Sequence, residues 1–229
     1  IVTGLVGSEM CIRDSHSKDL VNWKLIGYGL HREDQCNGDM NLVDVQSDGG
    51  IHAPTIRYHK GTFYIITTNV YNSGDGKPGL MRNFVITAKD PSGPWSEPHI
   101  IEGAPGIDPD IFFDTDGKVY FTGTHSPGDM NANGIGEIWI QELDIKNWKL
   151  RGDRKTVWDG VFGCCTEGPH IYKEHGLYYL LVAEGGTGKN HAVMMAASKD
   201  IFGPYEENQR NPVLTTRHVT NDYFVNSTG

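Results

Sequence analysis

No stretch of this 229-residue chain approaches the ~18 consecutive apolar residues that a membrane-spanning helix needs. Basic residues are also scarce, because 20 Lys and Arg stand against 29 Asp and Glu and give a formal net charge of -9. Nucleic acids and anionic membrane surfaces attract proteins that carry basic patches. The composition therefore argues against nucleic acid and against a membrane as partners.

Cysteine is sparse as well. The four cysteines, Cys11, Cys36, Cys164 and Cys165, fit no zinc-binding spacing and are too few for a disulfide framework in a chain of this length. Cys164 and Cys165 are adjacent, which makes an ordinary bridge between them geometrically awkward. We interpret all four as structural or incidental.

Sustained helical periodicity with capping residues is missing from the whole chain, which favours an all-β fold. The 29 glycines and 11 prolines indicate many turns and therefore short strands. With 38% hydrophobic and 21% charged residues the chain can bury a core and is not a candidate for disorder.

One segment recurs three times, which matters because a fixed period can decide the fold. The copies run from Ala53 to Tyr64, from Asp108 to Tyr120 and from Gly168 to Tyr179, and their prolines lie 55 and 60 residues apart. Each copy has a short strand, a turn containing glycine and a second apolar strand, which predicts a β-hairpin.

A second element alternates with the hairpins, and consists of a polar turn with Asp followed by an aromatic residue that can pack between layers. Its four copies are Ser17–Trp23, Ala88–Trp95, Glu142–Trp148 and Ser198–Tyr205. Hairpin, strand and Asp turn together predict one four-stranded blade per period, and tandem blades close into a propeller. The alternative is an irregular β-sandwich with chance similarity between the hairpins.

The position before each repeat proline changes character along the chain. It is Ala53, then Asp108, then Gly168 preceded by Glu167. Carboxylates are costly to bury, so packing does not require them at a position that faces a propeller axis. Two carboxylates converging on one cavity are what a glycosidase uses as acid and base. The alternative is that each side chain caps a turn.

Several motifs together resemble family 43 of the glycoside hydrolases, especially its β-xylosidase and α-L-arabinofuranosidase members. They span nearly the whole of residues 16–229 in the family's order, as Gly50-Ile51-His52-Ala53-Pro54-Thr55, Gly106-Ile107-Asp108-Pro109, Phe112-Phe113-Asp114, Thr166-Glu167-Gly168-Pro169-His170-Ile171-Tyr172, Glu184-Gly185-Gly186-Thr187 with His191, and Gly203-Pro204-Tyr205-Glu206 with Asn211-Pro212-Val213-Leu214.

The resemblance implies a five-bladed β-propeller that hydrolyses glycosidic bonds with inversion, using three carboxylates. It makes Glu167 the general acid and Asp108 the carboxylate that raises the pKa of the acid and orients it. It places the substrate-binding residues at Thr187, His191, His52 and Asn83. No cofactor is implied, and no ligand cluster here supports the axial calcium ion that some members hold.

Two features depart from the family pattern. The family's general base is an Asp in an Asp-Pro motif upstream of residue 16, and residues 1–15 contain no such motif. The run VGSEMCIRDS resembles translated sequencing-adaptor sequence, so we exclude residues 1–15 as non-native and assign 16–229 to the glycosidase domain. A pocket histidine expected after a Thr-Gly pair is also absent, because Thr228-Gly229 ends the chain.

Three further signals have ordinary explanations. Asp114-Thr115-Asp116-Gly117 resembles the start of a calcium loop but reads as a hairpin turn without the downstream ligands. His170 suits packing or hydrogen bonding better than catalysis. Asn226-Ser227-Thr228 is a glycosylation sequon, and it slightly favours an extracellular location.

We therefore predict an inverting glycosidase truncated at both ends, with about three full blades plus partial ones, that removes terminal xylose or arabinose from plant cell-wall oligosaccharides. Lacking its base, this piece should be poorly active. The rivals are an endo-arabinanase, a retaining sucrose- or fructan-cleaving relative, and a non-catalytic carbohydrate-binding propeller or inactive fragment.

Overall fold

The computed structural model describes residues 2–5, 12–32, 35, 49–71, 80–162 and 164–218. These residues form strands, turns and irregular segments and no helix, so the predicted all-β class is confirmed for them. Within the same ranges there is accordingly no helix of the length and apolarity that crossing a membrane would take. The chain divides into two compact units, Ile1–Ala104 and Pro105–Gly229.

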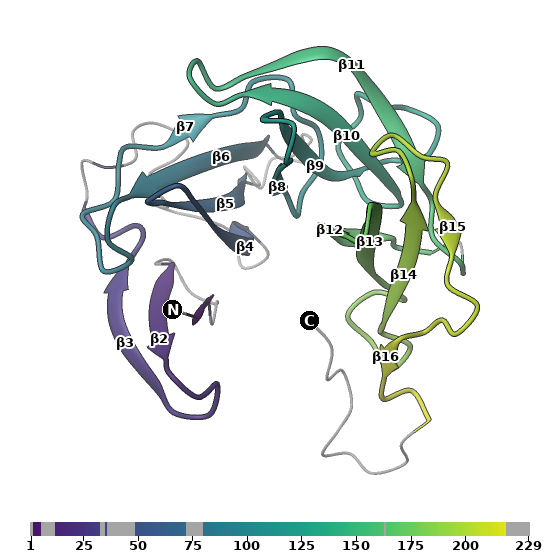
Figure 1. Cartoon of the computed structure of the whole chain (residues 1–229), viewed down its shortest axis with the longest axis horizontal. Helices are drawn as coiled ribbons and strands as arrows, with labels where there is room; N and C mark the ends of the chain where they lie inside the picture. The colour runs from purple at the N-terminus through teal and green to yellow at the C-terminus, as the bar shows by residue number, and fades with distance from the viewer. Residues whose placement is uncertain are drawn as a thin grey trace. The chain divides into compact units, whose positions relative to one another are not determined.

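The first unit contains two antiparallel sheets. One joins β1 (Val2–Leu5), β2 (Arg13–Ser17) and β3 (Trp23–Tyr28) in that order, and the other joins β4 (Gly50–His59), β5 (Thr62–Tyr71), β6 (Leu80–Ala88) and β7 (His99–Ile100) (Figure 1). Phe63 and Ile65 of β5 and Phe84, Ile86 and Ala88 of β6 are apolar and buried, and they point to one face of the sheet because successive strand residues alternate in direction. Their side chains form one core with Ile12, Leu30 and Trp95.

The second unit repeats this plan twice. One sheet runs through β8 (Asp110–Phe113), β9 (Val119–His125), β10 (Glu137–Asp144) and β11 (Lys149–Trp158), and the next through β12 (Glu167–Glu174), β13 (Leu177–Glu184), β14 (Ala192–Ser198) and β15 (Glu206–Glu207), with β16 (Leu214–Thr215) also paired to β14. Strand β12 contacts β8 and β9 of the preceding sheet (Figure 1). A single apolar core, including Ile138, Ile140, Leu180 and Met194, joins the two sheets.

The backbone confirms the hairpin repeat that the sequence predicts. The residue before each repeat proline has a positive φ, which is 40° at Ala53, 56° at Asp108 and 60° at Gly168. A residue before proline is normally extended, so this shared conformation marks equivalent positions rather than chance similarity. Two of the three hairpins also close with two-residue turns of positive φ, at Lys60-Gly61 and His175-Gly176.

The predicted Asp turns are present, and each is stabilised in the same way. One carboxylate oxygen of Asp19, Asp90, Asp144 and Asp200 accepts the backbone N–H two residues further on. The aromatic residue that follows behaves less uniformly. Trp95 and Tyr205 are buried, whereas Trp23 is 40% exposed, so the prediction that it packs between layers is wrong for that copy.

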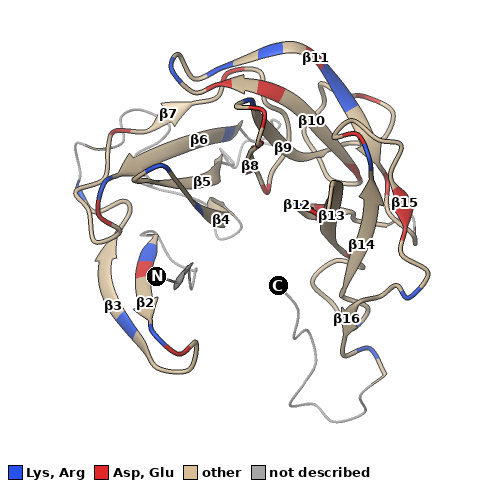
Figure 2. Cartoon of the chain, in the orientation of Figure 1, with Lys and Arg blue, Asp and Glu red and all other residues tan. Residues whose placement is uncertain are grey.

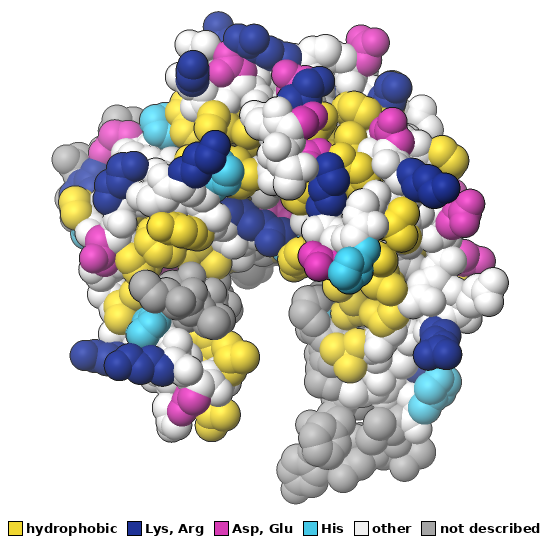
Figure 3. Space-filling model, viewed as in Figure 1, with side chains coloured by type: hydrophobic (Ala, Val, Ile, Leu, Met, Phe, Trp, Pro, Cys, Tyr) yellow, Lys and Arg dark blue, Asp and Glu magenta, His cyan; other side chains and the backbone are white. Residues whose placement is uncertain are grey.

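Charged side chains are spread along both units. Figure 2 shows acidic residues on β15 and basic residues on β11, and the face drawn in Figure 3 carries both signs interspersed with apolar side chains. Cys11, Cys36, the sequon at 226–228 and the terminal Thr228-Gly229 lie outside the described residues.

Candidate active site

Asp108 stands on a strained segment that is held against the end of β9. Its φ of 56° lies in the left-handed region, where a residue other than glycine costs roughly 1–3 kcal/mol and persists only if its surroundings impose it. The backbone N–H of Thr124 donates to the carbonyl of Ile107 at 3.2 Å. A Cβ added to Gly106 would lie 1.7 Å from the carbonyl oxygen of Thr124, so only glycine allows this approach. Tight packing therefore fixes the direction of the Asp108 segment.

Glu167 opens β12 and is held by the same threonine. The hydroxyl of Thr124 donates to the carbonyl of Thr166 at 2.9 Å, and Gly136 N–H donates to that carbonyl at 3.1 Å. Both threonines are fully buried. Thr124 thus bonds to Ile107 through its backbone and to Thr166 through its side chain, which are the residues immediately before the two predicted carboxylates.

A second contact joins the two strands further along. Nδ1 of His170 on β12 lies 3.3 Å from Oδ2 of Asp110, a fully buried carboxylate at the start of β8. The hydrogen-bonding role expected for His170 is present in this contact. The chain segments that carry Asp108 and Glu167 are therefore tied together both before and after the two carboxylates.

The electrostatics of Glu167 match what a proton donor needs. Burial first, and the negative charge of Asp108 second, raise the pKa of the Glu167 carboxyl from its ordinary 4.5 to about 7. Both effects disfavour the ionised form. The upward shift expected from pairing these two carboxylates is found, and it leaves Glu167 able to hold a proton close to neutral pH.

Glu184 is a buried carboxylate that supports the loop before Glu167. Its two oxygens accept the backbone N–H groups of Val161 and Phe162 at 2.6 and 3.0 Å. Burial raises its pKa, while these bonds and the charge of Arg217 oppose the rise. A Cβ on Gly160 would lie 1.8 Å from Oε1 of Glu184, so loop and carboxylate are in close contact. Glu184 has no exposed surface and is engaged in holding the loop.

The turn after β13 carries two of the predicted sugar-binding residues. Thr187 is exposed there, and His191 closes the turn by placing Nδ1 2.5 Å from the carbonyl of Gly186. The N–H of Gly185 donates to the carbonyl of Cys164, at 3.3 Å. The turn with Thr187 and His191 is therefore bonded to the loop that leads into Glu167.

The other two predicted sugar-binding residues belong to the first unit. His52 is half-buried on β4, and its backbone carbonyl accepts the hydroxyl of Thr67 at 2.6 Å. Asn83 on β6 is buried, accepts the hydroxyl of Thr68 and donates to the carbonyl of Ala104. Its amide thus also stabilises the sheet of its own unit.

Sequence reasoning missed an aromatic and a basic side chain beside the Glu167 loop. Phe162 is 54% exposed, and the guanidinium carbon of Arg217 lies 4.9 Å from the centre of its ring. Arg217 also donates to the carbonyl of Asn190 at 2.8 Å. The signal available in the sequence is an aromatic residue shortly before the candidate acid, because aromatic faces offer apolar contact area beside polar groups.

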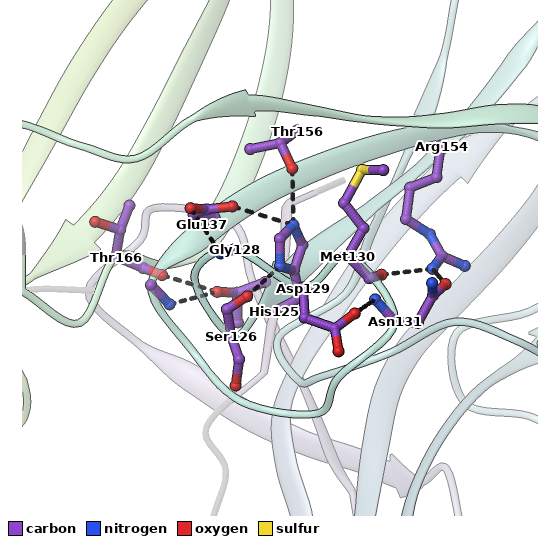
Figure 4. A network of polar contacts seen from close by, with 12 residues as sticks. His125, Ser126, Gly128, Asp129, Met130, Asn131, Glu137, Arg154, Thr156 and Thr166 are labelled. Atoms are coloured by element: carbon purple, nitrogen blue, oxygen red, sulfur yellow. Dashed lines mark hydrogen bonds and ion pairs between the residues drawn. The ribbon is translucent and has the colours of Figure 1, made fainter.

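A buried histidine supports the segment that contributes Gly136. Figure 4 shows His125 bonded through Nδ1 to the carbonyl of Ser126 and through Nε2 to the hydroxyl of Thr156, with Glu137 3.7 Å away. These bonds anchor the start of the loop between β9 and β10. No group of three or more His, Cys, Asp or Glu side chains within the described ranges could hold a metal ion.

A buried carboxyl group whose pKa is raised further by a second carboxylate is an arrangement that acid–base hydrolases use. Residues 3–229 match the family described as glycosyl hydrolases family 43. The chain is 47% identical to a xylosidase/arabinosidase of Butyrivibrio fibrisolvens over 93% of its length, and 43% identical to a xylan 1,3-beta-xylosidase of Vibrio over 88%. A crystal structure of a xylan beta-1,4-xylosidase from Bacillus halodurans superposes over 90% of the chain with a TM-score of 0.79 at 36% identity.

The chain belongs to glycosyl hydrolase family 43. It covers 40% of the Butyrivibrio relative, 37% of the Vibrio relative and 38% of the Bacillus structure, so it spans about two fifths of the proteins that it matches.

Proposed function

We propose that this chain is the acid-bearing part of a glycoside hydrolase that releases terminal xylose or arabinose from plant cell-wall oligosaccharides. The observation that carries the proposal is the pKa of Glu167, raised to about 7 by burial and by Asp108. A carboxylic acid that stays protonated near neutral pH can donate to a leaving oxygen. Family membership and the names of the relatives, which include xylosidases and an arabinofuranosidase, support the substrate class.

In this proposal Glu167 is the general acid, which protonates the glycosidic oxygen as the bond to the sugar breaks. The negative charge of Asp108 favours the protonated form of Glu167, and Asp108 orients the carboxyl group. A water molecule attacks the opposite face of the sugar, so the product has the inverted configuration. The base that activates this water should then stand roughly 6.5–9.5 Å from Glu167.

Thr187, His191, His52 and Asn83 form the sugar-binding set of the proposal. Support for the first two comes from the backbone bond between Gly185 and Cys164, which joins their turn to the loop of Glu167. Ala53 has a positive φ like Asp108 and is its equivalent in another repeat, so His52 lies in the place that Ile107 has beside Asp108. The partner of this set is an oligosaccharide, and the proposal needs no cofactor.

The proposed architecture is a five-bladed β-propeller in which each four-stranded sheet is one blade. Its support is the identical strand order of three sheets and the positive φ shared before each repeat proline. Blades built on one plan bring equivalent positions to a common axis. In this arrangement Asp108 and Glu167 occupy the inner ends of neighbouring blades.

We propose further that residues 1–15 are not native and that the enzyme's own sequence here is 16–229. The support is Asp14, a buried carboxylate in β2 whose Oδ1 has no hydrogen-bond partner among the described residues. Buried carboxylates are normally paired, because desolvation is costly. The family match starts at residue 3 and gives this proposal no support. The proposal rests on the unpaired buried carboxylate oxygen of Asp14 in β2.

The experiment compares Glu167→Gln with the unmodified protein, each in the full-length enzyme that contains this chain. With oligosaccharide substrates, loss of the acid should lower the rate roughly 10²–10⁴-fold. With activated aryl xylosides or arabinofuranosides the loss should be far smaller, because their leaving groups need little proton donation. Glu174→Gln, at the exposed far end of the same strand, is the matched control and should leave both rates unchanged.

Two outcomes would contradict the proposal. Equal losses on both substrate types would remove the acid role from Glu167. Sugar binding without hydrolysis by the unmodified enzyme would favour a carbohydrate-binding protein. Proton NMR of the first product adds an independent readout, since a retained anomer would place the enzyme with retaining glycosidases.

A further inference from the structure

The loop that leads into Glu167 carries two adjacent cysteines whose side chains meet. Successive side chains of an extended chain point in opposite directions. Cys165, however, has a φ of 59°, and its Sγ lies 2.7 Å from Sγ of Cys164. Both thiols are free, with Cys164 exposed and Cys165 half-buried. The backbone therefore already holds two sulfurs together that adjacent positions would ordinarily separate.

The surroundings of the pair maintain this conformation. A positive φ at a residue other than glycine is unfavourable unless neighbouring contacts impose it. The carbonyl of Cys164 accepts the N–H of Gly185. On the other side, the hydroxyl of buried Thr166 donates to the carbonyl of Asp159 at 2.8 Å. Sγ of Cys165 faces Gly186, where an added Cβ would lie 3.9 Å away. The two thiols are thus preorganised by the fold.

We propose that Cys164 and Cys165 form a thiol modification site, which a small-molecule disulfide oxidises to a vicinal disulfide. The thiolate of Cys164 attacks one sulfur of the small disulfide, whose S–S bond breaks and releases one thiol. Cys165 then loses its proton to solvent and attacks Sγ of Cys164, which releases the second thiol. The two cysteines lose two electrons and two protons, and the small disulfide is reduced to two thiols.

The order of the two steps follows from exposure and acidity. Cys164 is the exposed thiol and meets the disulfide first. The hydrogen bond with Cys164, then burial, then the charges of Cys164 and Glu167 raise the pKa of Cys165 to about 11, so little of it is thiolate at neutral pH. Once Cys164 is in a mixed disulfide, it has neither a thiolate charge nor an S–H group, so its contributions to the raised pKa of Cys165 are removed. Cys165 then ionises more readily, beside the sulfur that it must attack.

The test uses the unmodified 229-residue chain with glutathione disulfide as the probe. Trypsin cuts after Lys155 and Lys173, and the peptide between them contains Cys164 and Cys165 and no other cysteine. Mass spectrometry should find this peptide lighter by two hydrogen atoms and resistant to alkylation. Closure should be at least about tenfold more complete in the native chain than in guanidinium chloride, because only the fold brings the sulfurs together.

Single variants separate the two roles. Cys165→Ser should accumulate a mixed disulfide at Cys164, and Cys164→Ser should react at least about tenfold more slowly. A stable mixed disulfide in the unmodified peptide, an unreacted peptide, or equal closure in native and denatured chains would overturn the proposal. The native-to-denatured comparison needs no variant, so it stands even if a substitution prevents folding. None of these measurements depends on the proposed glycosidase activity.

Discussion

At the scale of single residues, Asp14 is the least favourable group that the structure describes in the first sheet. Its carboxylate is 2% exposed, accepts one hydrogen bond from Nε1 of Trp95 at 2.9 Å, and leaves Oδ1 unpaired. Burial raises its pKa from 3.8 to about 7, against the opposing effect of the Trp95 bond. Ionisation of Asp14 therefore lowers the stability of the folded state once the pH is at or above neutral.

The pH dependence of stability should show this cost with a definite sign. A raised pKa in the folded state means that the folded chain binds a proton that the unfolded chain releases, so stability falls as the pH rises from about 4 to about 7. Asp14→Asn keeps an acceptor for Trp95 and carries no charge. We expect it to increase the free energy of unfolding at pH 8 by on the order of 2 kcal/mol, and to have little effect at pH 4.

Urea unfolding at the two pH values checks this prediction. Asp19→Asn, in the turn that joins β2 and β3, is the matched control, because hydrogen bonds from the backbone and side chain of Asn22 lower the pKa of Asp19 and stabilise its charged form. That variant should lose stability at pH 8, opposite in sign to Asp14→Asn. A loss of stability in Asp14→Asn at pH 8 would show that the charge of Asp14 is satisfied.

At the scale of secondary-structure elements, the strands of the second unit are positioned by Thr124 at the end of β9. It connects the segments before Asp108 and Glu167, through its backbone to Ile107 and through its hydroxyl to Thr166. The hydroxyl also accepts the N–H of Gly136 at 3.1 Å. Removing the hydroxyl would leave buried polar groups with fewer partners and loosen one side of the candidate site.

Thr124→Val removes the two hydrogen bonds of the hydroxyl at nearly constant volume and keeps the backbone bond to Ile107. In the full-length enzyme we expect kcat for oligosaccharides to fall about tenfold, equivalent to about 1.4 kcal/mol, with a smaller change for activated aryl substrates. The pH at which the rate falls on the alkaline side should also move, because it reports the ionisation of Glu167. Thr124→Ser keeps the hydroxyl and should restore both values. If serine and valine behave alike, the hydroxyl does not position the acid.

The elements themselves could be predicted because their signals are local. Glycine after Lys60 and His175 closes two-residue hairpin turns, and Asp at four turns bonds to the backbone two residues on. These interactions span a few residues, so the printed sequence contains all the information that they need.

The support around the candidate site could not be predicted, because it depends on contacts distant in sequence. Thr124 is an ordinary strand residue until β12 is placed beside β9, where its partner is a backbone carbonyl 42 residues away. The role of Glu184 in holding a loop could not be predicted from the motif that contains it, because the backbone N–H groups that it binds lie 22 and 23 residues away. The contact between Cys164 and Cys165 depends on one backbone angle, which the side-chain types do not specify.

At the scale of the whole molecule, two carboxylates occur at positions that need no charge for packing, and the proposed proton donation gives them a role. The repeat supplies equivalent places before each proline, of which Asp108 occupies one, while Glu167 directly precedes another, Gly168, in the same unit. Burial, and then the negative charge of Asp108, raise the pKa of Glu167 above that of an ordinary carboxyl group. The proposed hydrolysis depends on proton donation by Glu167.

The most direct measurement is the pKa of Glu167 itself, obtained by ¹³C NMR titration of the chain with labelled glutamate carboxyl groups. The Glu167 resonance is assigned as the one missing from Glu167→Gln. The account predicts a midpoint at about 7, against 4.5 for an ordinary glutamate. In Asp108→Asn the midpoint should fall yet stay above 4.5, because burial is the larger of the two causes. A midpoint near 4.5 in the unmodified chain, or one that Asp108→Asn leaves unchanged, would contradict the account.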